Sequence, residues 1–362
     1  MSAPHFHELK VKRVSPEAAG AVSITFDIPA NLREAFAFEP GQFLTLRATI
    51  NGQDVRRNYS ISSPRSRLTK QGEIEVGIRA VENGLFSNWA TTEVKAGDTL
   101  KVMTPDGRFV VKKQRAIHRV GFAGGSGITP ILSIAASTLE EQPESKFTLV
   151  YGNRNMATVM FNEALQDLKD RFAGRFTMIH ILSSQAQEVD LLQGLIDGDK
   201  VRALIAAFLP VKSMDEVFIC GPEPMMDAVE KTLIESGVPA NRVYSERFSA
   251  GAPAGAQVVS IDAPKASAER TVQLTIVVDG TEHHMKMAST ERVLDVGLDA
   301  GLDLSFSCKA GVCCTCRAKV LCGSVTMDKN YTLEADEIAQ GFVLSCQARP
   351  TSEQVTISFD ER

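Results

Sequence analysis

The chain has no long apolar run. No stretch of its 362 residues is apolar over the length that a bilayer span needs, and no apolar segment follows a basic start. We therefore expect neither a transmembrane helix nor a secretory signal peptide. The chain also has no large excess of charge of either sign, since the formal net charge is only −5. This balance gives no basic field for nucleic acid or for an anionic membrane surface, so we expect neither as a partner.

The chain also lacks internal repeats, low-complexity tracts and the cysteine spacing of a secreted disulfide framework. Its seven cysteines instead suit a reducing, cytoplasmic setting. No convincing general acid–base pair or nucleophile stands out.

Four of those cysteines carry the strongest signal. Cys308, Cys313 and Cys316 follow the pattern C-x4-C-x2-C, and 29 further residues separate Cys316 from Cys346. This is the plant-type spacing for a [2Fe–2S] cluster. Gly311 and other small residues let the backbone wrap closely, so that N–H groups point at the sulfurs. Free buried thiols or a zinc site are the alternatives, but two-plus-two zinc spacings do not fit. Three cysteines remain as non-ligands: Cys220, Cys314 and Cys322.

The first part of the chain, residues 1–113, is predicted to be an antiparallel β-barrel. Short runs rich in β-branched and aromatic residues at 21–28, 43–50 and 74–81 are separated by glycine and proline. Many short strands with turn signals are typical of a small barrel.

Residues 114–248 change to a βαβ rhythm, which predicts a doubly wound parallel sheet. The expected strands are 119–123, 147–151, 176–182 and 216–220, and the expected helices are 129–140, 158–171 and 223–236.

Residues 249–269 are rich in Ala, Gly, Pro and Ser, and we expect a linker there. Residues 270–362 then predict an α+β ferredoxin domain of the β-grasp type. Its expected strands are 272–278, 282–287, 316–321 and 354–359, with helices near 291–300 and 333–339 and a turn at Asp279-Gly280.

Two segments of the predicted barrel suit a flavin that carries a pyrophosphate. Arg57 offers a cation for phosphate, Tyr59 a flat face for the ring and Ser60 a hydroxyl near the reactive nitrogen. Gly84-Leu85-Phe86-Ser87 opens a helix-like stretch whose N–H groups can bind phosphate, and Arg79 adds charge. An ordinary strand with a surface Arg57, and a solvated Arg79, are the alternatives.

A glycine-rich turn follows the first strand of the βαβ region. In Gly124-Gly125-Ser126-Gly127-Ile128-Thr129-Pro130, a backbone without side chains can approach a dinucleotide pyrophosphate. Cys220-Gly221-Pro222 ends another strand, where ligands of open α/β sheets bind. Cys220 then lies beside the nicotinamide, or is simply a small buried residue.

The nucleotide preference is predicted from the strand at 147–151. No acid follows it, whereas an NAD site usually has one there to bind the ribose hydroxyls. Arg154 is placed to meet a 2′-phosphate, and Ser183 can add a hydroxyl. We therefore expect NADPH to be the preferred nucleotide, with NADH as the alternative. The alternative for Arg154 is an exposed loop arginine that contacts no ligand.

These motifs, taken in order, resemble the ferredoxin–NADP⁺ reductase superfamily over residues 5–248, followed by a plant-type ferredoxin. The resemblance implies FAD rather than FMN, and an acidic–aromatic element at Glu246-Arg247-Phe248 near the flavin edge. It implies Tyr59, Ser60, Cys220 and Glu246 as catalytic residues. It also implies cofactor contacts at Ile78, Phe86 and Phe248 beside the residues named above.

Three stretches carry a closer resemblance, to the reductase components of phenylacetyl-CoA epoxidases: residues 147–154, 217–222 and 330–334. That resemblance implies hydride transfer from NADPH to FAD, then single electrons through the cluster to a di-iron oxygenase component. Reductases of ring-hydroxylating or steroid hydroxylase systems have the same build. A non-enzymatic redox sensor is a third hypothesis, disfavoured by the full set of flavin and nucleotide motifs.

Overall fold

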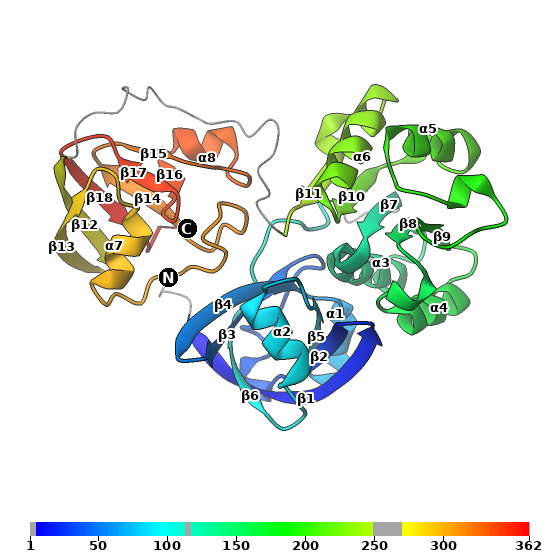
Figure 1. Cartoon of the computed structure of the whole chain (residues 1–362), viewed down its shortest axis with the longest axis horizontal. Coiled ribbons are helices and arrows are strands. Elements are labelled where there is room, and N and C mark those ends of the chain that lie inside the picture. The colour runs from blue at the N-terminus through cyan, green and yellow to red at the C-terminus, as the bar shows by residue number, and fades with distance from the viewer. Residues whose placement is uncertain (1–4, 113–116, 249–269, 362) are drawn as a thin grey trace. The chain divides into compact units, whose positions relative to one another are not determined.

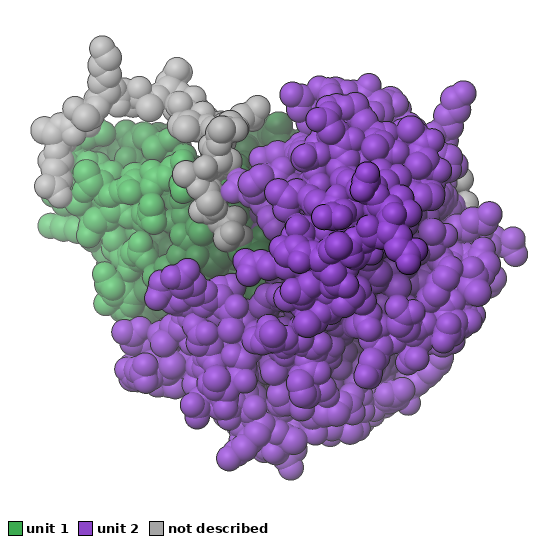
Figure 2. All heavy atoms as spheres, turned by 45° about the vertical axis from the view of Figure 1, so that its right-hand side comes forward, with its two compact units in different colours: residues 1–6, 56–58, 248–362 green, residues 7–55, 59–247 purple. Residues whose placement is uncertain are grey.

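The structure is a computed structural model, and it describes residues 5–112, 117–248 and 270–361 (Figure 1). They form two compact units (Figure 2). Of the described residues, one unit holds 7–55 and 59–247, and the other holds 5–6, 56–58, 248 and 270–361. The predicted linker at 249–269 lies outside the described residues. In the described ranges, no helix combines the length and apolar character needed to cross a bilayer.

The first module is an antiparallel six-stranded sheet with strand order β4-β3-β6-β1-β2-β5. Its strands are β1 (Phe6–Ala18), β2 (Ala21–Asp27), β3 (Phe43–Ile50), β4 (Gln53–Ser60), β5 (Glu73–Arg79) and β6 (Thr99–Met103), with helices α1 (Arg65–Gln71) and α2 (Leu85–Thr92) and a 3₁₀ turn at Ala30–Leu32. The expected strand at 74–81 ends early, at Arg79. The tight turn between β3 and β4 rests on left-handed Asn51 and Gly52, with φ of 52° and 78°.

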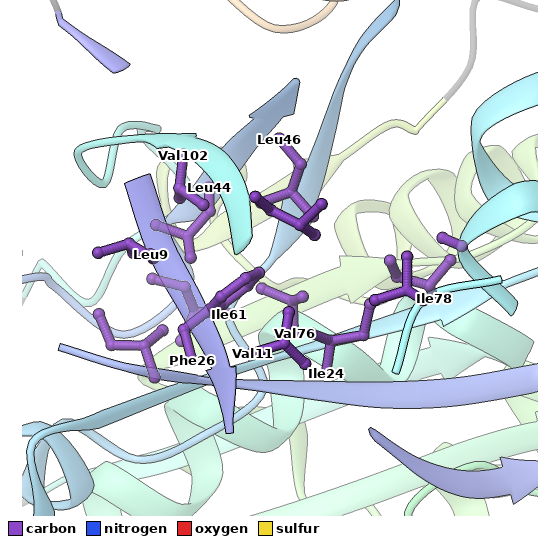
Figure 3. Packing of buried hydrophobic residues seen from close by; sticks show 14 of the residues in the cluster. Leu9, Val11, Ile24, Phe26, Leu44, Leu46, Ile61, Val76, Ile78 and Val102 are labelled. Carbon is purple, nitrogen blue, oxygen red and sulfur yellow. The ribbon is translucent and has the colours of Figure 1, made fainter. Parts of the chain in front are cut away.

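Apolar side chains of these strands meet inside the module. Leu9, Phe26, Leu46 and Val76 are fully buried there, and Figure 3 shows them with their neighbours. β1 was not predicted, although Leu9 and Val11 alternate with charged residues. It pairs with β2 through register shifts between Val11 and Arg13 and between Pro16 and Ala18.

The second module is a parallel five-stranded sheet with strand order β11-β10-β7-β8-β9. Its strands are β7 (His118–Gly124), β8 (Lys146–Asn153), β9 (Phe176–Leu182), β10 (Glu216–Cys220) and β11 (Val243–Glu246). Its helices are α3 (Ile128–Glu141), α4 (Asn162–Arg171), α5 (Gly198–Ala207) and α6 (Glu223–Glu235), with 3₁₀ turns at Gly125–Gly127, Met156–Thr158, Asp190–Leu192, Val211–Ser213 and Ala240–Arg242.

The alternation of side chains along the strands explains why helices cover both faces of this sheet. Phe218 and Cys220 of β10 pack in the same cluster as α3 and α4, whereas Val217 and Ile219 pack with α5 and α6. The expected helix at 158–171 begins only at Asn162, because Phe161 before it is left-handed with φ of 58°. Helix α5 was not predicted.

The third module is a mixed five-stranded sheet with strand order β13-β12-β18-β14-β16, and a two-stranded pair β15-β17. Its strands are β12 (Thr271–Val278), β13 (Thr281–Ala288), β14 (Arg317–Cys322), β15 (Val325–Met327), β16 (Phe342–Leu344), β17 (Ala348–Pro350) and β18 (Gln354–Ser358), with helices α7 (Val293–Asp299) and α8 (Ala335–Ala339). The predicted turn is present at Asp279 and Gly280, both with positive φ. The predicted fold class, a barrel, a doubly wound sheet and a β-grasp module, is therefore confirmed.

Candidate functional site

Three of the four predicted catalytic residues lie together at the ends of strands. Ser60 is the last residue of β4, and its hydroxyl donates to Oε2 of Glu246 at 3.0 Å. Glu246 ends β11 and is the parallel register partner of Cys220, which ends β10 and is fully buried. The ends of three strands from two modules therefore place a hydroxyl, a carboxyl and a thiol in one region.

Burial sets the protonation of this group. Loss of solvent raises the pKa of Glu246 to about 8, and the hydrogen bond from Ser60 offsets only part of that rise. Burial, and secondarily the charge of Glu246, raises the pKa of the Cys220 thiol. Near neutral pH the pair is therefore a carboxylic acid beside a neutral thiol, and the site can hold a proton at Glu246.

Tyr59 precedes this group on β4 and is half-buried. Its ring centroid lies 5.6 Å from that of Phe86, with the planes tilted by 38°, so the ring packs on the first residues of α2. Phe86 itself is buried, which makes its side chain a support for Tyr59. This packing fixes the orientation of the Tyr59 ring, as a flat support for a flavin requires.

The predicted phosphate site lies at the start of α2. A side chain at Gly84 would place its Cβ 2.4 Å from Oγ of Ser87 and 2.5 Å from Cγ2 of Val81, so those two side chains would have to shift. Ser87 donates its hydroxyl to the Gly84 carbonyl and accepts from the Val81 N–H, both at 3.3 Å, which shapes the turn. The first N–H groups of the helix then have no intrahelical acceptor and are suited to a phosphate.

A cavity of about 450 Å³ adjoins this helix start, lined among others by Asn51, Gly84 and Trp89. Arg57 on β4 is exposed, and its guanidinium donates to the Arg56 carbonyl at 2.7 Å. Ile78 is buried in the barrel core and its side chain points into that core (Figure 3), so only its backbone is able to contact a ligand.

Arg79 is partly buried, and its guanidinium contacts the second module. Its Nη2 donates to the Thr158 carbonyl at 2.6 Å, which belongs to the nucleotide-binding module. Desolvation, and secondarily the charge of Arg154, lowers the pKa of Arg79. The structure therefore brings Arg79 and Arg154 into one electrostatic environment.

The glycine-rich turn and the Cys220-Gly221-Pro222 segment pack directly against each other. A Cβ at Gly127 would lie 2.1 Å from the Cys220 carbonyl oxygen, and one at Gly124 would lie 2.5 Å from Pro222. Gly125 differs, because its φ is +53° and no heavy atom lies within 4 Å of the place of its Cβ. Gly124 and Gly127 thus serve packing, whereas Gly125 leaves an open backbone surface.

Two side chains stabilise this turn. Thr129 donates its hydroxyl to the Ser126 carbonyl at 3.0 Å, as expected for a residue that shapes the turn. The Tyr151 hydroxyl donates to the Gly125 carbonyl at 2.9 Å. Sequence reasoning missed Tyr151, although a tyrosine within an apolar strand signals a hydroxyl that needs a buried partner.

Arg154 and Ser183 follow adjacent parallel strands, β8 and β9. Arg154 is exposed, and its backbone carbonyl accepts from the N–H of Ser184 at 2.8 Å. The residues that follow these two strands, 154–155 and 183–185, include no acid. Of the predicted C-terminal element, Glu246 is in the site, whereas Phe248 is 46% exposed.

The four ligand cysteines form two pairs. The side chains of Cys308 and Cys313 contact each other, as do those of Cys316 and Cys346. The described residues contain no group of three or more His, Cys, Asp or Glu side chains close enough for a single metal ion. Two sulfurs for each of two irons is the arrangement that a binuclear cluster needs, so the donor set fits [2Fe–2S] and not mononuclear zinc.

Backbone conformation supports this arrangement. Lys309 and Gly311 have positive φ values of 51° and 81°, and the N–H of Ala310 donates to Sγ of Cys308 at 3.3 Å. Cys314 points elsewhere, since its thiol donates to the Thr332 hydroxyl at 3.0 Å, and Cys322 is exposed. Sequence reasoning missed one further contact, from the buried Gln347 amide to Sγ of Cys346 at 3.4 Å.

Comparisons with known proteins agree with these sites. An oxidoreductase FAD-binding domain matches residues 9–111, an oxidoreductase NAD-binding domain residues 122–231, and a 2Fe-2S iron-sulfur cluster binding domain residues 276–351. A chain with these modules is an electron-transfer reductase that uses a nicotinamide nucleotide, FAD and a [2Fe–2S] cluster.

The similar proteins name the family. The chain is 43% identical to the E component of 1,2-phenylacetyl-CoA epoxidase from Escherichia coli (strain K12), over 99% of this chain and 98% of that protein. It is 36% identical to the ferredoxin reductase component of 3-ketosteroid-9-alpha-monooxygenase of Rhodococcus rhodochrous, over 97% and 96%. The chain belongs to this family of oxygenase reductase components, as the resemblance of its motifs predicted, and its partner is an oxygenase component.

Solved structures share the fold. Phthalate dioxygenase reductase matches with a TM-score of 0.59 at 21% identity, over 98% of both chains. An intact type IV self-sufficient cytochrome P450 monooxygenase matches with a TM-score of 0.69 at 20% identity, over 97% of this chain and 41% of that one. The three-module architecture therefore occurs both as a separate chain and inside a longer one.

Proposed function

We propose that this protein takes electrons from NADPH and passes them, through FAD and the [2Fe–2S] cluster, to a di-iron oxygenase that epoxidises phenylacetyl-CoA in the cytoplasm. The observation that carries the proposal is the 43% identity to a component of phenylacetyl-CoA epoxidase over 99% of the chain. The steroid monooxygenase reductase matches a similar length at 36% identity.

The chain's own residues have distinct tasks in this proposal. FAD, when bound, accepts a hydride and releases electrons singly to the cluster. Tyr59 supports the ring. With flavin bound, the protonated Glu246 donates its O–H to the Ser60 hydroxyl, and the single Ser60 proton is then donated to the reactive nitrogen. Cys220 sits at the end of β10, where the nicotinamide enters.

Binding is assigned to a second set of residues. We assign the flavin pyrophosphate to Arg57 and the start of α2, with backbone contacts at Ile78, Gly84, Phe86 and Ser87. The nucleotide is assigned to the turn at 124–129, to Gly221 and Pro222, and to Arg79, Arg154 and Ser183. Phe248 is assigned to the flavin edge.

The proposal also fixes module boundaries. We assign residues 1–113 to flavin binding, 114–248 to the nucleotide, 249–269 to a linker and 270–362 to the cluster. The family matches at 9–111, 122–231 and 276–351 support this division because each falls inside one segment.

Reconstitution tests the function. The reductase is mixed with a purified di-iron oxygenase component, and NADPH oxidation and epoxide formation from phenylacetyl-CoA are measured together. We expect one epoxide per NADPH. NADPH oxidation that does not depend on the oxygenase, with no epoxide formed, would falsify the partner assignment.

A steroid or ring hydroxylase is the second candidate partner, favoured by the 36% identity to the Rhodococcus rhodochrous protein. The same assay with a steroid or aromatic-ring oxygenase separates the two. If electrons are delivered faster to either of those oxygenases than to the epoxidase, that oxygenase is the partner of this reductase.

A further inference from the structure

Gln347 directly follows the ligand Cys346, and its side chain is almost fully buried, with 1% exposed. Its amide nitrogen Nε2 lies 3.4 Å from Sγ of Cys346, 3.0 Å from the Lys309 carbonyl oxygen and 2.9 Å from the Cys346 carbonyl oxygen. One amide therefore contacts a cluster ligand on one side and the cysteine loop on the other.

The position of this amide is fixed by the backbone. The Gln347 N–H donates to the Leu344 carbonyl at 2.8 Å, and its carbonyl accepts from the Asp328 N–H at 3.0 Å. Asp328 in turn accepts from Arg292 at 3.0 Å and from Arg349 at 2.9 Å. The side chain thus extends from a braced segment and has little freedom to move away from the sulfur.

The cysteine loop closes over the same side chain. Gly311, with φ of +81°, leaves room for it, because a Cβ there would lie 3.3 Å from Cγ of Gln347 and 3.1 Å from the Lys329 carbonyl oxygen. Lys309, whose carbonyl accepts from Gln347, is itself left-handed with φ of 51°. The two left-handed residues of the cysteine loop, Lys309 and Gly311, therefore both pack against the Gln347 side chain.

We propose that Gln347 is a positioning residue that donates a hydrogen bond to the Cys346 sulfur and so raises the reduction potential of the cluster. A primary amide has two N–H bonds for the three acceptors within reach, so one N–H serves Lys309 and the other is shared by the carbonyl and the sulfur of Cys346. Hydrogen bonds to ligand sulfurs tune cluster potentials.

The sign follows from charge. Gln347 keeps its proton throughout, while one electron passes from the reduced flavin, which is oxidised by one electron, to the cluster. The added electron makes the sulfur a stronger acceptor, so a donor stabilises the reduced state more than the oxidised state. Removing the donor must lower the potential.

Two variants of the full-length protein remove the donor at similar volume, Gln347→Met and Gln347→Leu. The midpoint potential is measured by spectroelectrochemical titration followed by electron paramagnetic resonance. We expect both to shift the reduction equilibrium against the reduced cluster by roughly three- to tenfold, where tenfold is about 59 mV for one electron.

Ser345→Ala is the matched control. Ser345 is equally buried, and its hydroxyl donates to the Cys316 carbonyl at 2.8 Å but to no sulfur. We expect it to lower the unfolding temperature without moving the midpoint. If Gln347→Met retains its cluster and its midpoint potential is unchanged, Gln347 only stabilises the loop, and the proposal is overturned.

A measurement on the wild type covers the case in which a variant loses its cluster. Glutamine labelled with ¹⁵N in the side-chain amide is incorporated, and pulsed electron paramagnetic resonance is recorded on the reduced protein. We expect a ¹⁵N coupling to the cluster spin, and its absence would equally overturn the proposal. Neither measurement involves an oxygenase, so the outcome is independent of the proposed partner.

Discussion

The hydroxyl of Ser60 and the carboxyl of Glu246 are joined by a hydrogen bond of 3.0 Å across 186 positions of sequence. The bond connects the last residue of a barrel strand to the last residue of the parallel sheet. Because burial raises the pKa of Glu246 to about 8, the contact places a proton next to the proposed flavin position at neutral pH. The pH dependence of stability that Glu246 causes is therefore the most direct test of this contact.

Replacing Glu246 should change how stability depends on pH. Between its ordinary value of 4.5 and about 8, Glu246 keeps its proton in the folded state and releases it in the unfolded state. The wild type therefore loses stability as pH rises through this window, and Glu246→Gln should lose less. Urea unfolding at pH 5 and pH 8.5 measures the difference. Glu235→Gln, on the surface of α6, is the control, and equal pH slopes in all three proteins would contradict the shifted pKa.

The cysteine assignment predicts a sharp division among six substitutions by serine. Cys308, Cys313, Cys316 and Cys346 should each lose the cluster, because each supplies one of two sulfurs to an iron. Cys314→Ser and Cys322→Ser should keep it, since Cys314 contacts Thr332 and Cys322 is exposed. Iron per chain and the visible spectrum are the measurements. Cluster loss in Cys314→Ser together with retention in Cys313→Ser would reverse the assignment.

Arg57→Ala should weaken flavin binding. A charge-assisted bond to phosphate is worth about 1.5–3 kcal/mol, so the dissociation constant should rise about tenfold or more. The apoprotein is titrated with FAD and flavin fluorescence is followed. Arg47→Ala is a matched control, because Arg47 lies on β3 and pairs with Asp54. Equal weakening in both variants would remove Arg57 from the phosphate site.

Arg154→Ala should separate the two nucleotides. The kcat/KM with NADPH should fall about tenfold, because the 2′-phosphate loses a charged partner worth about 1.4 kcal/mol, whereas the value with NADH should barely change. Dye reduction is measured with each nucleotide, and Arg202→Ala on the surface of α5 serves as control. If the wild type already favours NADH, or if both nucleotides weaken alike, Arg154 does not bind the 2′-phosphate.

Two glycines of the nucleotide turn should respond differently to alanine. Gly127→Ala forces a Cβ to within 2.1 Å of the Cys220 carbonyl oxygen, which is backbone that has no room to shift. We expect a loss of about 1–3 kcal/mol of stability and weakened nucleotide binding. Gly125→Ala meets no atom within 4 Å, so it should cost only the left-handed backbone strain of about 1 kcal/mol. Thermal unfolding and nucleotide titration test both variants, and equal losses would refute the packing role of Gly127.

Secondary-structure elements with a clear hydrophobic pattern and clear turn residues at their ends were predicted from the sequence. The strands at 176–182 and 216–220 were predicted with the observed bounds, because each is mostly apolar and is followed by turn-forming residues, Ser183-Ser184 and Gly221-Pro222. β1 and α5 were not predicted, although Leu9 and Val11 alternate with charged residues and Val201, Leu204 and Ile205 have helical spacing. The start of α4 was wrong by four residues, because a left-handed Phe161 leaves no mark in the sequence.

The site shows the same division. The sequence spacing selected four cysteines that the structure brings together in pairs, and the resemblance to family motifs selected Ser60 and Glu246, which the structure joins by a hydrogen bond. The contacts of Gln347 and Tyr151 could not, because they depend on which backbone carbonyls the fold brings within reach. Arg79 was assigned to the flavin by sequence order, whereas its guanidinium contacts the Thr158 carbonyl across the module boundary.

The position of β11 has a further consequence. It is the edge of the parallel sheet, it has only four residues, and it is hydrogen-bonded to β10 alone among the strands of that sheet. Short edge strands are among the first segments to open by local fluctuation, well below the free energy of global unfolding. Fraying of β11 would withdraw the Glu246 carboxyl while Cys220, on the next strand, stays in place. Glu246 therefore lies on a strand that can open locally, whereas Cys220 lies on β10, between β11 and β7 in the sheet.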